Sequence, residues 1–128
     1  MTKKLEEWFR QADYDLDTAE FMFTGGRYFY AIFMCHLSIE KALKGLYVQF
    51  REAAAPRSHN LVYLAEKTEL QLPEELSDFI SLLDGVSVPT RYPDDLQRLL
   101  KDYDKARTRE MLKKSREVLR WLRAKSQK

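Results

Sequence analysis

Apolar residues recur along the first 24 positions of the chain at the three-and-four spacing of a single helical face. These residues are Leu5, Trp8, Phe9, Ala12, Leu16, Ala19 and Phe23. Charged residues fall on the opposite face, and Gly25 and Gly26 follow, where glycine accepts the left-handed geometry that ends many helices. The pattern predicts a helix that ends at these glycines and turns tightly into the next one.

A second apolar stripe predicts a longer helix from about residue 28 to about residue 54. This stretch contains no proline, and Gly45 is its sole glycine. The stripe consists of Ile32, Cys35, Ile39, Ala42, Leu43, Leu46 and Phe50. Because the connection between the first two helices is short, we expect them to be antiparallel neighbours.

A polar break over 56–60 separates the second helix from a short predicted helix over 61–68. Ser58 or Asn60 can cap that helix by accepting its free backbone N–H groups. Pro73 then opens another predicted helix, which runs to about residue 86. A proline in the first turn lacks only an N–H group that would be unpaired anyway.

The last third of the chain combines a proline-bracketed segment with a basic helix. Prolines at positions 89 and 93 push the residues before them toward extended geometry, which predicts a stiff loop over 88–93. We expect a final helix from about residue 103 to about residue 124, with Ala106, Met111, Leu112, Leu119 and Leu122 facing inward. No segment alternates like a strand. The sequence therefore predicts an all-α fold, an up-and-down antiparallel bundle of four to five helices that forms a single domain over 1–128.

The composition of the chain narrows its location and chemistry. Its 128 residues include 45% hydrophobic and 33% charged residues, a balance typical of a globular domain. No apolar run approaches the ~20 residues of a membrane span, so we expect a cytoplasmic protein without membrane contact. Cys35 has no partner for an internal disulfide, and the two histidines, His36 and His59, cannot form a zinc-ligand set. We expect neither a metal nor a cofactor.

Charge is unevenly distributed along the chain. Residues 1–97 contain 10 Lys and Arg and 16 Asp and Glu, a net charge of −6, whereas residues 98–128 contain 12 and 4, a net charge of +8. A basic helix of this kind can attract nucleic acid or an acidic partner. It can equally be satisfied by the acidic part of the same protein.

Polar residues interrupt the second helix along one ridge. His36, Glu40, Lys44 and Tyr47 follow one another at spacings of four, four and three, and Ser38 and Lys41 lie beside them. Glu40 and Lys44 have the favourable orientation of a helical ion pair, which is compatible with a surface pair or a pair in a dimer interface. The alternative is a polar pocket in which Lys41 and Lys44 meet a phosphate group.

Two other segments carry candidate functional groups. Arg91 and Tyr92 lie in the predicted stiff loop, where they could bind an anion and a ring, or only fasten the loop to neighbouring helices. His59 lies in the polar break, where it could act as a general base or serve as a capping or packing residue. Gly25 and Gly26 lack the sequence context of a phosphate-binding loop, which excludes a nucleotide-binding fold of that type.

Several segments together resemble the HEPN domain, a small helical module named for its occurrence in higher eukaryotes and prokaryotes and for proposed nucleotide binding. The resemblance runs from about Trp8 to Trp121. The first segment that carries it combines Ala12, Asp15, Leu16 and Ala19 with Gly26, Arg27, Tyr28 and Ala31. The second is the run Ile39-Glu40-Lys41-Ala42-Leu43-Lys44, which is similar to the family's E-K-x-L-K signature. The third is the histidine-containing run Pro56-Arg57-Ser58-His59-Asn60-Leu61, and the last is the R-Y-P segment in Val88-Pro89-Thr90-Arg91-Tyr92-Pro93-Asp94.

The resemblance implies a helical bundle that dimerises and often works beside a minimal nucleotidyltransferase, including in toxin–antitoxin pairs. Some branches of the family are metal-independent ribonucleases in which an Arg precedes a His by four to six intervening residues. This chain departs from that spacing, because seven residues separate Arg51 from His59 and one separates Arg57 from His59.

The sequence therefore favours a non-catalytic binding and interaction module over an enzyme. We expect a homodimer that binds a nucleotide, or the nucleotidyltransferase that holds one, through Glu40, Lys41, Lys44, Arg91 and Tyr92. One alternative is a metal-independent ribonuclease toxin that uses His59 together with Arg51, Arg57 or Arg91. Another is a structural dimer whose basic last helix docks an acidic partner.

Overall fold

A computed structural model of the protein describes residues 2–91 and 96–126. The helices within these ranges are α1 (Lys3–Thr24), α2 (Tyr28–Arg51), α3 (Leu61–Thr68), α4 (Glu74–Arg91), α5 (Leu96–Asp102) and α6 (Lys105–Lys125). The described part contains no strand, so the predicted all-α bundle is confirmed, with one short helix, α5, beyond the expected number. None of these described helices combines the length and the apolar character needed to cross a membrane.

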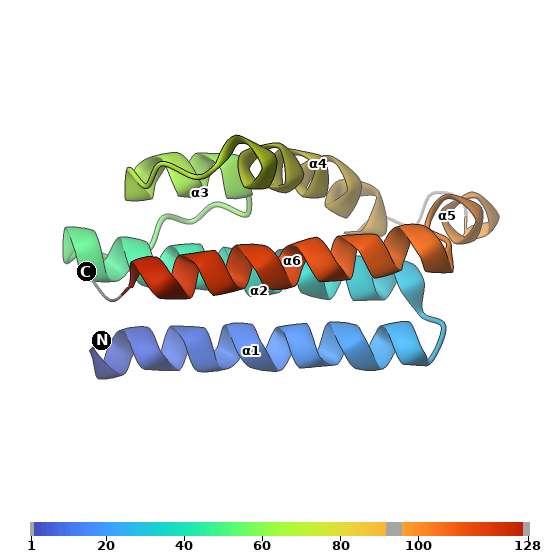
Figure 1. The fold of residues 1–128 in the computed structure, drawn as a ribbon, viewed down its shortest axis with the longest axis horizontal. Helices are drawn as coiled ribbons and strands as arrows, with labels where there is room; N and C mark the ends of the chain where they lie inside the picture. Colours follow the sequence, from blue (N-terminus) through green and yellow to red (C-terminus); the bar gives the residue numbers. More distant parts are fainter. Residues whose placement is uncertain (1, 92–95, 127–128) are drawn as a thin grey trace.

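Helix α2 lies at the centre of the bundle. It packs against α1, α3, α4 and α6. Figure 1 shows α1, α2 and α6 running alongside one another, with α3 and α4 along the upper side of the view. The predicted apolar stripe of α2 forms the core, since Ile32, Ile39, Leu43 and Leu46 are completely shielded from solvent. The packing of each of these neighbouring helices therefore depends on side chains of α2.

The α1–α2 hairpin is built on two glycine positions. Gly26 has a φ of 78°, the left-handed geometry that the glycine pair predicted for this turn. Gly45 allows α2 to approach α1 closely, because a Cβ atom there would lie 2.5 Å from the Cβ of Trp8. The close approach places the polar residues of α2 within reach of α1.

The ends of two helices differ from the sequence-based expectation. Helix α2 ends at Arg51, three residues earlier than expected, and Glu52 takes the left-handed conformation with a φ of 50°. Helix α4 continues to Arg91, so the stiff loop predicted over 88–93 is wrong for its first four residues. A proline disfavours the helical conformation of the residue before it without forbidding it. The packing of α4 on α2 and α3 outweighs that preference.

Some of the basic residues of α6 form ion pairs within the protein. Arg123 Nη2 lies 2.6 Å from Asp13 Oδ1, and Arg116 pairs with Glu20, so two ion pairs fasten α6 to α1. Both pairs are partly exposed, and their spacing of seven residues on each helix fits two antiparallel helices. Acidic residues of α1 and basic residues of α6, near the two ends of the chain, therefore attract each other.

Cys35 lies in the core between α2 and α6 and is 1% exposed. Burial raises the pKa of its thiol to about 12, which outweighs the opposite effect of its hydrogen bond with Ser115. The thiol is therefore protonated and shielded in the folded protein.

Candidate functional site

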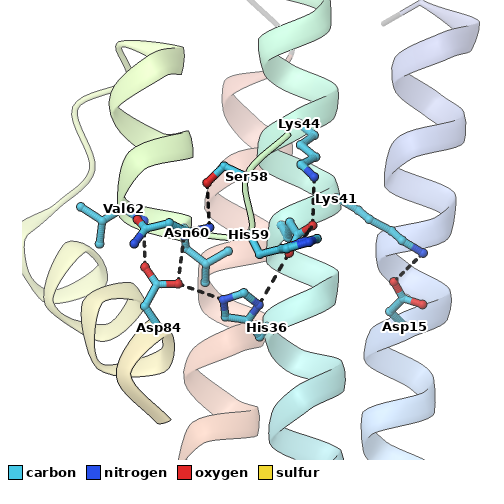
Figure 2. Close-up of polar contacts among 11 residues, drawn as sticks. Asp15, His36, Lys41, Lys44, Ser58, His59, Asn60, Val62 and Asp84 are labelled. Carbon is cyan, nitrogen blue, oxygen red and sulfur yellow. Dashed lines mark hydrogen bonds and ion pairs between the residues drawn. The ribbon is translucent and has the colours of Figure 1, made fainter. Parts of the chain in front are cut away.

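The carboxylate of Glu40 is the centre of a polar network inside the bundle. Glu40 lies on the inner side of α2 and is 3% exposed. Its Oε2 atom accepts hydrogen bonds from two sources, Lys44 Nζ at 3.0 Å and His59 Nδ1 at 2.9 Å (Figure 2). The helical ion pair predicted between Glu40 and Lys44 is thus present, and it is largely buried instead of lying on the surface.

His59 comes to Glu40 from the loop between α2 and α3. Its side chain is 68% exposed even though Nδ1 is bound to a buried carboxylate. An Nδ1–H group that donates to a carboxylate leaves Nε2 of a neutral ring as a proton acceptor. Glu40 therefore holds one edge of the imidazole while much of the ring remains open to solvent.

His36 extends the network into the core. It lies one helical turn before Glu40 and is 1% exposed. Its Nε2 atom is 2.9 Å from Asp84 Oδ1 on α4, and its Nδ1 atom is 3.8 Å from Glu40 Oε1, beyond hydrogen-bond distance. Two carboxylates on different helices, those of Glu40 and Asp84, therefore face the two nitrogens of one buried imidazole. Figure 2 shows the contact between His36 and Asp84.

Asp84 fixes the beginning of α3. Its two oxygens accept hydrogen bonds from the N–H groups of Leu61 at 2.9 Å and Val62 at 3.1 Å, and Asn60 caps the same helix through the N–H of Tyr63. Burial alone would raise the pKa of Asp84. The hydrogen bonds from His36 and these N–H groups, with the charge of His36, outweigh burial and lower the pKa below its ordinary value. The loop that carries His59 is thereby anchored immediately after that residue.

Two further polar residues of α2 contact α1. Lys41 Nζ lies 2.9 Å from Asp15 Oδ2, and the hydroxyl of Ser38 donates to the Ala12 carbonyl at 2.7 Å. The predicted ligand-binding set is therefore divided. Glu40 and Lys44 meet at His59, whereas Lys41 is engaged with α1.

The arginines that the sequence singled out lie in different surroundings. Arg51 pairs with Glu69 at 2.5 Å and donates to the Lys67 carbonyl. Arg57 is exposed and makes no ion pair with any described residue. The side chain of Arg91 and the whole of Tyr92 lie outside the described residues.

A larger hollow lies away from this network. It has a volume of about 720 Å³ at the start of α1 and the end of α2, and Trp8, Val48 and the alanines at 53–55 line it. Neither a histidine nor a cysteine lines this hollow, so we place the candidate site at Glu40 and His59. Over the described ranges, no group of His, Cys, Asp and Glu side chains is arranged to hold a metal ion.

Comparison with protein families gives a match over nearly the whole chain. The model of the HEPN domain matches residues 5–125. The chain belongs to the HEPN domain family. The resemblance drawn from the segments around Glu40, His59 and Arg91 is thereby confirmed.

Solved structures agree with this assignment to the HEPN family. The crystal structure of TT1696 from Thermus thermophilus is similar with a TM-score of 0.82 at 24% identity, over 97% of this chain and 99% of that chain. The crystal structure of ST0689, described as an archaeal HEPN homologue, gives a TM-score of 0.76 at 28% identity, over 97% and 98% of the two chains. A search of curated proteins found no match.

Asp84 is the residue of this HEPN site that sequence reasoning missed. It lies on α4 one turn after Ile80 and next to Leu83, both of which are buried. A charged residue on the core-facing stripe of a helix needs a partner, and this was the available signal. The identity of the partner could not be read from the sequence, because His36 is 48 positions away.

Proposed function

We propose that this HEPN protein is a ribonuclease that cleaves single-stranded RNA with His59 as its general base. The observation that supports the proposal is the contact between His59 Nδ1 and the buried Glu40 Oε2, at 2.9 Å, in a side chain that is 68% exposed. A base needs a fixed tautomer and an open second nitrogen, and this arrangement supplies both.

The reaction that fits this group is an internal transfer at phosphorus. His59 Nε2 removes the proton of a ribose 2′-hydroxyl, and the 2′-oxygen forms a bond to the adjacent phosphorus. The bond from phosphorus to the 5′-oxygen breaks, and that oxygen leaves with a proton from water or from the protonated imidazole. The products are a 2′,3′-cyclic phosphate and a free 5′-hydroxyl. Arg57, which has no ion-pair partner among the described residues, is the available cation for the developing charge.

Cleavage of an end-labelled RNA in excess EDTA tests the proposal. We expect wild-type protein to cleave and His59→Gln to be slower by about 10²- to 10⁴-fold, since this is the usual contribution of a general base. Lys113→Ala, prepared in parallel, changes an exposed residue of α6 and controls for contaminating nuclease. Inert wild-type protein, or equal cleavage by His59→Gln, would remove the proposal.

A second candidate function is the binding of a nucleotide, or of a nucleotidyltransferase partner as in toxin–antitoxin pairs. The supporting observation is that Lys41 and Lys44 keep 25% and 14% of their side chains exposed on α2. A phosphate would have to compete with Asp15 and Glu40 for these ammonium groups. Isothermal titration with ATP and GTP on wild type, Lys41→Ala and Arg91→Ala tests the idea, and no heat with any of them overturns direct nucleotide binding.

We also propose that a second copy of this chain covers the outward side of α2. Tyr30 is 50% exposed, and Met34 and Leu37 are half-buried on that side, next to Lys41. An apolar stripe on the central helix fits a helix-to-helix interface between two copies. Sedimentation velocity is expected to give a dimer that Leu37→Glu converts to monomer. Leu82→Glu, at a 50% exposed leucine of α4, is expected to leave it unchanged.

A further inference from the structure

A shallow hollow of about 450 Å³ lies on the loop that carries His59. Pro56, Arg57, Ser58, Asn60 and Tyr63 line it. Ser58 and Asn60 are the chain neighbours of His59, so their Cα atoms lie about 3.8 Å from that of the histidine. The volume falls within the range of about 300–1,000 Å³ that small-molecule sites occupy.

Tyr63 supplies an aromatic surface to this hollow. Its side chain is 41% exposed in the first turn of α3, where Asn60 and Asp84 hold the backbone. Lys67, one turn later, places its Nζ atom 5.4 Å from the centre of the ring. An exposed ring on a fixed helical turn with a cation beside it is a platform on which a nucleobase stacks.

The polar groups of the hollow are hydrogen-bond donors. Asn60 Oδ1 accepts from the N–H of Tyr63 at 2.7 Å, which fixes the amide and leaves its NH₂ group for a ligand. Ser58 Oγ accepts from the N–H of Asn60 at 3.1 Å, so its hydroxyl hydrogen is available. Arg57 adds a guanidinium group without an ion pair to any described residue. Such a set suits a ligand rich in acceptors, such as phosphate oxygens and base carbonyl groups.

We propose that this hollow is a binding subsite for one unpaired nucleotide of an RNA strand, with the base on Tyr63 and the phosphate at Arg57. The proposal rests on the proposed function for the identity of the ligand as RNA. A nucleotide held there is the neighbour of the nucleotide presented to His59. The subsite therefore sets the position of the strand relative to the base that removes the proton.

Binding of a short, labelled, fully 2′-O-methylated RNA tests the subsite without cleavage, because the reacting hydroxyl is blocked. Tyr63→Leu is expected to weaken binding by about 5- to 150-fold, the loss that follows removal of one stacking surface, whereas Tyr63→Phe keeps the ring and the affinity. Arg57→Gln is expected to lower the slope of log affinity against log salt by about 0.7, the value for one phosphate contact on a single strand.

Matched controls come from exposed residues far along the chain. Tyr14→Leu removes a 74% exposed tyrosine on α1, and Arg120→Gln removes an exposed arginine on α6. Both are expected to bind like wild type. Equal losses in the controls, unchanged affinity of Tyr63→Leu, or no binding by wild type would each overturn the subsite.

Failure of the subsite can be told apart from failure of the ribonuclease. If RNA binding depends on Tyr63 but the protein does not cleave unmodified RNA, the subsite proposal is supported and the ribonuclease proposal is contradicted. If cleavage depends on His59 but is equally fast in Tyr63→Leu, the ribonuclease proposal is supported and the subsite proposal is contradicted.

Discussion

Glu40 is a buried acid on the central helix of the bundle, so neighbouring groups must balance its charge. Lys44 and His59 do so by hydrogen bonds to one oxygen, and His36 lies near the other. The same carboxylate thus stabilises the bundle and orients the exposed histidine. A change at Glu40 should therefore alter stability and activity together.

Glu40→Gln tests the stabilising part of this role. The amide keeps the volume of the side chain but leaves Lys44 without its counter-charge and places an NH₂ donor next to other donors. We expect the free energy of unfolding to fall by about 2–3 kcal/mol, measured by urea denaturation. Glu7→Gln, which removes an exposed pair with Arg10, is expected to cost less than about 0.5 kcal/mol. Equal stability of Glu40→Gln and wild type would contradict this account of the network.

Asp84 makes the stability of the folded protein depend on pH. An ordinary aspartate titrates near pH ~3.9 in an unfolded chain, and the pKa of Asp84 is lower in the folded protein. Its contribution to stability is therefore fully present above about pH 4 and is lost as the pH falls through the folded-state pKa. Asp84→Asn should destabilise the protein at neutral pH, and its difference from wild type should shrink in acid.

Urea denaturation of wild type and Asp84→Asn over a series of pH values gives the measurement. Asp78→Asn, at an exposed position of the same helix, is the matched control and should follow wild type throughout. A difference between Asp84→Asn and wild type that stays constant with pH would show that the ionised carboxylate is not what holds α3.

At the scale of single residues, the sequence predicts which groups matter better than where they lie. The spacing of His36, Glu40 and Lys44 indicates their common ridge, and it predicts the pair of Glu40 and Lys44. It does not predict the contact between Glu40 and His59, because that contact depends on how the loop between α2 and α3 folds back toward α2. Such a long-range contact leaves no periodic signal in the chain.

At the scale of elements, helix bounds follow local rules where those rules act alone. The helix over 61–68 has the bounds that the sequence predicts, because Asn60 caps it and a polar break precedes it. Helix α4 runs past Pro89 because its packing on α2 and α3 competes with the local preference. Helix α5 spans seven residues, too few to show a helical period in the sequence.

Two glycines in helices offer opposite predictions from the same substitution. Gly45→Ala brings a Cβ atom to 2.5 Å from Trp8 Cβ, so we expect a loss of about 1–3 kcal/mol of unfolding free energy despite the better helix propensity of alanine. Gly85→Ala meets nothing within 4 Å, so we expect a gain of about 0.5–1 kcal/mol. Thermal and urea denaturation of both variants measure the difference. Equal effects of the two substitutions would contradict the close approach of α1 and α2.

At the scale of the whole molecule, the net charge of +2 conceals two oppositely charged parts that contact each other. The sequence alone allows the acidic part of the protein to satisfy its own basic helix. The pairs of Asp13 with Arg123 and Glu20 with Arg116 support that alternative. The pairing itself could not be predicted, because it requires the last helix to lie antiparallel to the first.

The double variant Arg116→Gln/Arg123→Gln tests this contact. We expect a loss of about 1 kcal/mol of unfolding free energy at low salt and much less near ~1 M NaCl, where partly exposed ion pairs are screened. Lys113→Gln/Arg120→Gln removes the same charge from exposed positions of α6 that form no ion pair within the described part, and should change stability less. A loss that is independent of salt would assign the effect to packing.

The shielded thiol of Cys35 can serve as a probe for transient opening of the core. Because it is the single cysteine of the sequence and its pKa is about 12, a thiol reagent can react only when α2 and α6 separate. The rate of labelling in native buffer would therefore measure how often α2 and α6 separate. Adding RNA during such an experiment would reveal whether a ligand bound near His59 also steadies the distant core around this thiol.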